Sequence, residues 1–134
     1  MQKIKLWQLQ FQPKSKIKAW EQKKSGLYKF FTSSSIQKSY IDEYSHIWPA
    51  LIFWTWWSAS VHFCDEIFST STDCFVLKAN DENINLKYVS YYLKGNINIL
   101  ENWFKWAGLK HISKEYLSNI DIPLPSLEQQ KQIV

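Results

Sequence analysis

The hydrophobic pattern of this chain changes its period once, and that change constrains the fold most strongly. Through residue 80 the apolar side chains come in short runs between polar or turn-forming residues, which is typical of buried strands. From Asn85 onward, Leu86, Val89 and Leu93 recur at helical spacing. We therefore predict an α+β fold, in which a small, twisted, mostly antiparallel sheet is followed by a few helices. The predicted strands lie within 25–35, 49–54, 60–64 and 71–80, and the first of them ends in a polar loop.

Capping residues mark where the predicted helices begin. Asn85 is a suitable N-cap for a helix that ends near Gly95, the residue expected at the C′ position. Ser113 is expected to cap a short helix, after which two prolines hold 121–125 extended.

A further helix is predicted at the C-terminal end of the chain. Ser126 and Gln129 form a capping-box pattern, so a helix begins there. We expect this helix to continue past Val134, which would make the chain a fragment. Residues 1–125 are expected to form one domain, and 126–134 the start of this truncated helix.

Size and composition are those of an ordinary globular domain. The chain has 134 residues, of which 46% are hydrophobic and 21% charged, so it can bury a proper core. Its longest uncharged run, 47–63, is broken by Pro49 and polar residues and is unsuited to spanning a membrane. The N-terminus lacks the pattern of a signal peptide. We expect a cytoplasmic protein without a membrane partner, in which Cys64 and Cys74 are buried free thiols.

Catalytic motifs are not found in the sequence. It contains no G-x-S-x-G elbow, no H-E-x-x-H, no phosphate-binding glycine loop and no D-x-D metal motif. The adjacent carboxylates at 42–43 and 65–66 have the chemistry to hold a metal in a nuclease. No lysine-bearing strand motif accompanies them, so surface acidity is the favoured interpretation. His62 is expected to be a hydrogen-bonded structural residue. We predict no metal, no cofactor and no enzymatic activity.

The basic balance of the chain favours a polyanionic partner. Lysines outnumber acidic residues and leave a net charge of +4, which is modest and dispersed along the chain. The sequence contains no arginine, the side chain best suited to bidentate recognition of guanine. Recognition of guanine by this chain would therefore fall to lysine.

The C-terminal segment "GLKHISKEYLSNIDIPLPSLEQQKQIV" (108–134) carries an ordered set of residues with specific spacing. It resembles the end of a target recognition domain in type I restriction–modification specificity subunits, where this segment leads into a long spacer helix. The stretches 26–44 and 60–78 resemble the first strand with its loop and the central strands of the same domain, so the resemblance covers nearly the whole chain. The matching C-terminal positions are His111, Ile112, Ser113, Leu117, Ile120, Ile122, Pro123, Pro125, Gln129 and Ile133.

The resemblance implies sequence-specific DNA binding without catalysis. Such a domain, which is similar to the target-reading domain of adenine DNA methyltransferases, reads one half of a bipartite target in double-stranded DNA. It does so for partner methyltransferase (M) and restriction (R) subunits. Methyl transfer and ATP-driven cleavage would belong to those partners, so S-adenosylmethionine and ATP are not expected to bind here. The spacer helix would set the distance to a second specificity half.

Three segments are predicted to contact DNA: the loop after the first strand, the connection between the next two strands, and the segment leading to Ser113. Gln37 has the chemistry for an adenine edge, and Lys110 for guanine or a phosphate. The candidate residues are Ser33, Ser34, Ser35, Gln37, Lys38, Thr55, Ser58, Ser60, Lys105, Lys110, His111 and Ser113.

Tryptophan and glycine occur in unusual numbers. The chain has eight Trp and three Gly, whereas average usage predicts about nine Gly. In "LIFWTWWSAS" (51–60) and "ENWFKWAGLKHIS" (101–113) the family that the chain resembles places glycine where tryptophan stands here. We predict that the tryptophans correspond to UGA codons that the source lineage decodes as glycine. Glycine at these positions would also suit a permissive turn at 54–57. The positions are Trp7, Trp20, Trp48, Trp54, Trp56, Trp57, Trp103 and Trp106.

Two other classes of function remain open from the sequence. One is a nuclease or a fused restriction–modification enzyme that carries this domain, and catalytic motifs in a longer reading frame would identify it. The other is a carbohydrate-binding module that uses tryptophan as a stacking platform. UGA codons at the tryptophan positions would exclude the second class.

Overall fold

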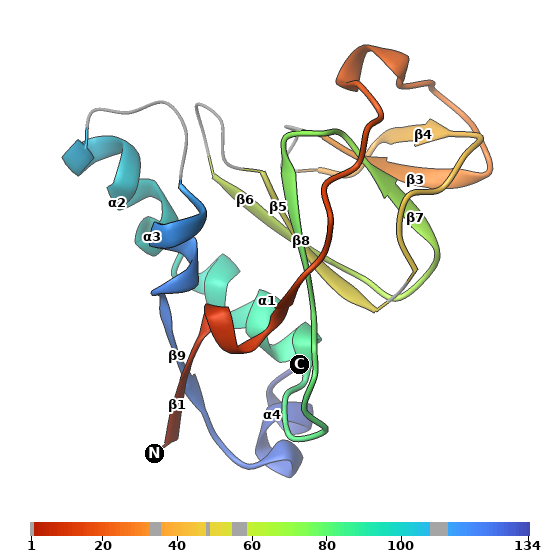
Figure 1. The fold of residues 1–134 in the computed structure, drawn as a ribbon. Coiled ribbons are helices and arrows are strands. Elements are labelled where there is room, and N and C mark those ends of the chain that lie inside the picture. Colours follow the sequence, from red (N-terminus) through yellow and green to blue (C-terminus); the bar gives the residue numbers. More distant parts are fainter. Residues whose placement is uncertain (1, 33–35, 48, 55–58, 108–112) are drawn as a thin grey trace.

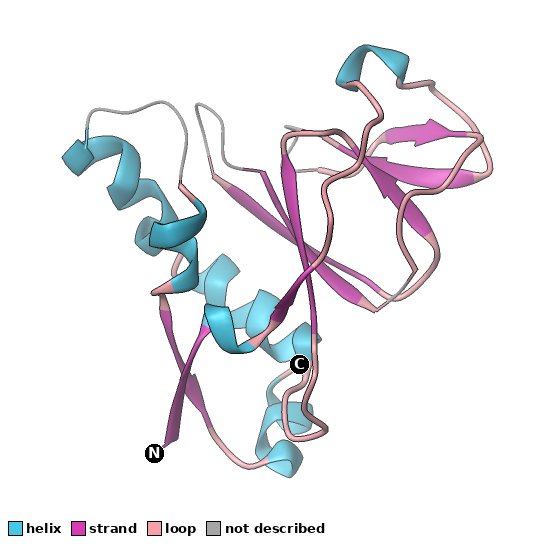
Figure 2. Cartoon of the chain, in the orientation of Figure 1, coloured by secondary structure: helices cyan, strands magenta, loops and turns pink. Residues whose placement is uncertain are grey.

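The computed structural model describes residues 2–32, 36–47, 49–54, 59–107 and 113–134, with the backbone alone for 103–107. These residues form three sheets and a set of helices (Figures 1 and 2). None of the helices in these ranges has the length and hydrophobicity needed to traverse a bilayer. In chain order the elements are β1 (Gln2–Lys5), the 3-10 turn η1 (Leu6–Gln8), β2 (Gln10–Phe11), the 3-10 turn η2 (Ala19–Glu21), β3 (Tyr28–Phe31), β4 (Ser39–Ile41), β5 (Ala50–Trp54), β6 (Ser60–Cys64), β7 (Phe68–Thr70), β8 (Cys74–Lys78), α1 (Leu86–Gly95), α2 (Asn98–Ala107), α3 (Lys114–Ser118), β9 (Asp121–Leu124) and α4 (Leu127–Ile133).

A four-stranded antiparallel sheet in the order β2–β8–β5–β6 forms the centre of the fold. Its inner strands are buried on both faces, which explains the uninterrupted apolar runs in the sequence. In β5, Leu51 and Phe53 face one side while Ala50 and Ile52 face the other, and none of the four is more than 1% exposed. The strands predicted from these runs are confirmed as β5, β6 and β8.

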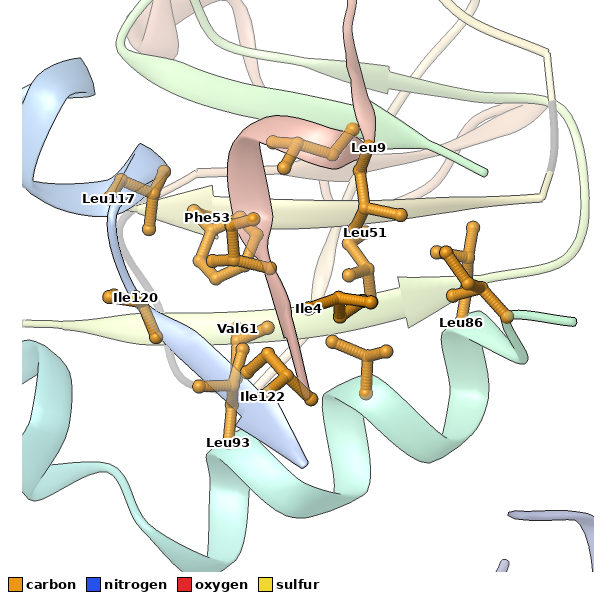
Figure 3. Packing of buried hydrophobic residues seen from close by; sticks show 14 of the residues in the cluster. Ile4, Leu9, Leu51, Phe53, Val61, Leu86, Leu93, Leu117, Ile120 and Ile122 are labelled. Carbon is orange, nitrogen blue, oxygen red and sulfur yellow. The ribbon is translucent and has the colours of Figure 1, made fainter. Parts of the chain in front are cut away.

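One face of this sheet is covered by helices and by a two-stranded ribbon of β1 and β9. Phe53 and Val61 from the sheet, Leu93 from α1, Leu117 from α3 and Ile122 from β9 belong to one hydrophobic cluster (Figure 3). Strand β1 pairs with β9 along its whole length. The N-terminal strand is therefore held by the C-terminal part of the chain.

The opposite face of the central sheet packs against a three-stranded sheet in the order β4–β3–β7. Phe31 from β3 and Phe68 from β7 share a cluster with Ile52 and Val76, and the two phenylalanine rings meet edge to face at 5.6 Å. Strands β3 and β7 pair in parallel, whereas the other described ladders are antiparallel. The predicted α+β fold with mostly antiparallel strands is confirmed. A domain boundary after residue 125 stays a prediction.

The predicted N-caps are confirmed by their hydrogen bonds. The Asn85 side chain accepts the Tyr88 N–H at 3.1 Å and begins α1. Ser113 begins α3. Ser126 and Gln129 form the predicted reciprocal capping box at the start of α4, with both bonds at 3.3 Å.

The C-terminal end of α1 differs from its prediction. Gly95 is the last helical residue and does not adopt the left-handed C′ conformation. Asn96 ends the helix instead, because its N–H donates to the Leu93 carbonyl (3.1 Å) and its side-chain amide donates to the Tyr92 carbonyl (2.9 Å). Helix α2 begins at Asn98, three residues after Gly95, so the chain needs no left-handed reversal there.

Candidate nucleic-acid interface

Most of the predicted contact residues lie outside the part of the chain that the structure describes. For Lys105 only the backbone, within α2, is described. The predicted contact residues outside the described ranges are Ser33, Ser34, Ser35, Thr55, Ser58, Lys110 and His111.

The other four candidates have defined surroundings. Lys38 is exposed, and the half-buried Gln37 donates its amide to the Ser39 carbonyl. Ser60 is 5% exposed, and its hydroxyl has no hydrogen-bond partner among the described atoms. The Ser113 hydroxyl accepts the N–H of residue 116 at 3.0 Å and thereby caps α3. DNA contact by these residues stays a prediction.

Two of the predicted contact segments leave the core from neighbouring strand ends. Phe31 ends β3 and belongs to the cluster against which Trp54, the last residue of β5, packs. Trp54 is paired with Ser60, the first residue of β6, and with Cys74, the first residue of β8. These four residues define one side of the fold, here named the loop edge. The segments that begin at residues 32 and 55 both start from the loop edge.

The third predicted segment returns to the fold near the same side. Lys114, the first residue of α3, places its ammonium 4.8 Å from the centre of the Phe11 ring. Phe11 packs edge to face on Phe75, with ring centres 6.0 Å apart. Phe75 pairs with Phe53, one position from the loop edge. In Figure 1 the N-terminal end of α3 and the adjoining ends of β5 and β6 lie toward the upper side of the molecule.

Two lysines concentrate positive charge beside the loop edge. The Lys14 ammonium lies 4.2 Å from the centre of the Phe75 ring, and Lys114 lies over the neighbouring Phe11 ring. Each such contact stabilises the position of the cation by about 0.5–1 kcal/mol at an exposed site and leaves its charge available to an anion. Sequence reasoning missed both lysines, because the two rings come together only when β2 pairs with β8.

A buried histidine network holds the segment that carries Lys14. The Thr70 N–H donates to the Ser45 hydroxyl (3.1 Å), which donates to His46 Nδ1 (2.7 Å). The His46 Nε2–H in turn donates to the Pro13 carbonyl at 3.1 Å. A carbonyl can only accept, so His46 carries its proton on Nε2. In the neutral ring Nδ1 then has a free lone pair, which accepts the Ser45 hydroxyl proton. Burial lowers the pKa of His46 and favours this neutral form.

The same segment lines a cavity of about 320 Å³ beside the histidine. Two cations, Lys14 and Lys78, border this cavity, and no carboxylate lies among its described walls. His62, the other described histidine, is 8% exposed, and its ring centre lies 5.2 Å from that of Phe31. It therefore packs between the two larger sheets.

One carboxylate of each adjacent pair considered as a metal site forms an ion pair. Asp42 binds Lys23 at 2.7 Å, and this hydrogen bond lowers the pKa of the carboxyl. Glu66 binds Lys29 at 3.2 Å and raises the pKa of that lysine. Within the described ranges, no group of three histidine, cysteine or acidic residues is placed to hold a metal ion. These carboxylates thus act as exposed partners of lysines in this structure.

The described tryptophans do not form one aromatic platform. Trp7 in η1 is 59% exposed and Trp20 in η2 is 80% exposed. The turn η1 begins at a hydrogen bond to the Ile120 carbonyl (3.1 Å), whereas η2 leads to a bridge between Lys23 and Tyr40 in β4. The side chains at 48, 56, 57, 103 and 106 lie outside the described part of the chain. The UGA hypothesis stays a prediction.

Comparisons with known proteins agree with the family suggested by the C-terminal motif. The family described as the type I restriction modification DNA specificity domain matches residues 8–134. The type I restriction enzyme MjaVIII specificity subunit of Methanocaldococcus jannaschii is 32% identical over 83 residues, which make up 62% of this chain and 20% of that protein.

Solved structures share the fold at low sequence identity. The type I restriction–modification S subunit from M. genitalium matches with a TM-score of 0.77 and 13% identity over 98% of this chain and 36% of that chain. A chain from a structural description of complex assembly in the type I R–M system matches with a TM-score of 0.69 and 14% identity, covering 98% and 36%. The HsdS subunit from Thermoanaerobacter tengcongensis gives 0.63 and 16%, covering 98% and 35%.

The chain spans 20% of the length of the curated relative named above and 35–36% of these solved chains. The low-identity structural matches establish the fold, while the sequence-family match covers nearly the whole chain. The family predicted from the C-terminal motif is confirmed, and the chain belongs to the type I restriction modification DNA specificity domains.

Proposed function

We propose that this chain is a DNA target recognition domain that reads one half of a bipartite target. The observation that carries the proposal is the arrangement of the three predicted contact segments. Two leave the loop edge directly and the third returns beside it, at a place where Lys14 and Lys114 hold positive charge. Strands β5 and β8 behind the loop edge are buried on both faces, so they form a rigid support at this side of the fold.

In this proposal binding is divided between two kinds of contact. Lysines neutralise phosphates and fix the position of the domain on the duplex, and they carry no sequence information themselves. Side chains of the three segments read base edges in the major groove. Gln37 has the donor and acceptor that an adenine edge requires, and Lys38 next to it is exposed.

The chemistry of restriction and modification is assigned to partner subunits. The domain selects the DNA site, and the methyltransferase and restriction subunits act there with their own S-adenosylmethionine and ATP. Helix α4, which Ser126 caps at the end of the domain, would carry the spacer toward a second specificity half. This assignment rests on the family to which the chain belongs.

The test is selection of bound duplexes from a random DNA pool by the chain assembled with its methyltransferase. We expect one short motif to be enriched. Gln37→Ala should relax the preference at one base position by about 1–3 kcal/mol, while Lys94→Ala, on the exposed side of α1, should leave the motif unchanged. A pool without an enriched motif, or binding that does not weaken with salt, contradicts the proposal.

A further inference from the structure

The segment between β2 and η2 presents lysines in alternation with anchored residues. Lys14, Lys16 and Lys18 are exposed, whereas Ser15 and Ile17 are only 7% and 9% exposed. The three exposed residues are here named the lysine row. Because each lysine is separated from the next by one inward-facing residue, all three lie on the outer side of the segment.

Hydrogen bonds to the turn before β8 hold the inward-facing residues. The Thr72 N–H donates to the Ile17 carbonyl at 2.9 Å, and the Thr72 hydroxyl donates to the Ser15 carbonyl at 2.5 Å. The Ile17 side chain packs in a small cluster with Phe30 and Ile41. The backbone of the lysine row is therefore ordered without any ligand, which reduces the entropy that binding would cost.

The lysine row leads to the loop edge. At its start, Lys14 rests on the Phe75 ring near the beginning of β8. Near its other end, the Ile17 carbonyl accepts the Thr72 N–H. Ser71, the residue before Thr72, donates its own N–H to the Phe31 carbonyl at 3.0 Å. In Figure 1 this orange-red segment rises past β8 to the upper side of the molecule. The row thus ends at the base of the predicted contact loop after β3.

The charges of the row are not neutralised within the described part of the chain. Three other lysines form ion pairs there, but no described ion pair includes a lysine of the row. The nearby carboxylate of Glu21 accepts the backbone N–H of Lys18 at 2.7 Å. An ordered row of unpaired ammonium groups is suited to a repeating anion, because each ammonium acts as a point charge toward one phosphate.

We propose that Lys14, Lys16 and Lys18 bind consecutive phosphates of one DNA strand beside the bases that the three predicted contact segments read. The inference rests on the proposed function and adds to it a contact site outside the three predicted segments. The row supplies affinity and register, and it does not distinguish sequences. It acts equally on target and unrelated duplexes.

The experiment compares salt dependence of DNA binding among matched variants of the full chain assembled with its methyltransferase. The test variant is Lys16→Gln/Lys18→Gln, and Lys14 is left in place because its removal would also disturb Phe75. The control, Lys87→Gln/Lys94→Gln, removes the same charge from exposed positions on α1. Lys16→Arg/Lys18→Arg keeps the charge. Thermal melting verifies that each variant folds.

In the test variant the fall of log K with log salt should be shallower, its slope smaller in magnitude by about 2, because about one counterion is released per phosphate contact. It should lose affinity by the same factor on target and unrelated duplexes, while the control and the arginine variant keep the wild-type slope. An unchanged slope in the test variant contradicts the phosphate contacts of the lysine row and leaves the proposed function standing. A loss of affinity confined to the target duplex contradicts them too. So does a variant that assembles poorly with the methyltransferase while its slope stays unchanged. Absence of DNA binding by the wild type overturns the proposed function itself.

Discussion

Replacing Gln130 by alanine is expected to detach helix α4 from the rest of the domain. Gln130 is fully buried. Its Oε1 accepts the Asn85 N–H at 2.8 Å. Its Nε2 donates to the carbonyls of Asn83 (2.8 Å) and Pro125 (2.9 Å). One side chain therefore satisfies three backbone groups, one of them at the residue that caps α1.

The expected loss follows from these three hydrogen bonds. Each contributes about 1 kcal/mol net, so their removal should lower the free energy of unfolding by about 3 kcal/mol. That is a large part of the roughly 5–15 kcal/mol by which a domain is stable. Gln130→Met retains most of the volume but none of the bonds, and we expect it to lose nearly as much as the alanine variant. The exposed Gln132, two residues further along α4, offers a matched control.

Urea unfolding followed by circular dichroism measures the difference between these variants. Gln130→Ala and Gln130→Met should both be destabilised by about 3 kcal/mol relative to Gln132→Ala, which should stay within about 0.5 kcal/mol of the wild type. Hydrogen exchange at the Asn85 amide should accelerate in the Gln130 variants only. A methionine variant as stable as the wild type would refute the reasoning, because it would show that volume and not hydrogen bonding holds α4.

Three further predictions concern single side chains. Cys64 and Cys74 are buried, and burial raises the pKa of the Cys74 thiol to about 12; iodoacetamide should therefore modify both only after unfolding, and labelling of the native chain at pH 8 would contradict this. Burial also lowers the pKa of His46 in the folded state, so as the pH falls the unfolded chain takes up the proton first. The contribution of His46 to stability should therefore be complete above about pH 6.5 and decrease below it. Unfolding at pH 7.5 and 5.5 should show a smaller pH difference in His46→Gln than in the wild type. Trp20→Gly should lower the free energy of unfolding by less than about 1 kcal/mol because the ring is exposed, whereas Trp54→Gly in β5 should lower it by about 2 kcal/mol or more. Equal shifts of the two melting temperatures would argue against this difference. Separately, TGG codons at the tryptophan positions would exclude the UGA hypothesis.

The sequence by itself determined the elements whose signal is local. Asn85 and Ser126 cap their helices through bonds to residues three positions away, so the pattern is visible in a short window. The apolar run of β5 is equally visible, because a strand buried on both faces needs no alternation. The family, too, follows from the order and spacing of C-terminal residues, without any knowledge of contacts.

Several elements could not be predicted because their partners are distant in the sequence. Strand β1, with the sequence Gln-Lys-Ile-Lys, has a weak strand signal and exists because β9 pairs with all four of its residues. The pairing of β3 with β4 and β7 likewise depends on distant residues, because this three-stranded sheet packs against Ile52 of the central sheet. Local sequence predicts a left-handed cap at Gly95, whereas the start of α2 three residues later, at Asn98, decided its conformation.

The candidate interface shows the same division. The alternation of lysine with serine and isoleucine at 14–18 can be read from the chain, but only the bonds from Thr72 decide which side faces solvent. The loop edge exists because Phe31 and Trp54 pack in one cluster, and the cation at Lys114 joins it through two rings on different strands. Local sequence thus determined the helix caps, the buried strands and the family. Tertiary packing decided which polar side chains meet, because the free energy that brings them together comes from burying apolar residues elsewhere in the chain.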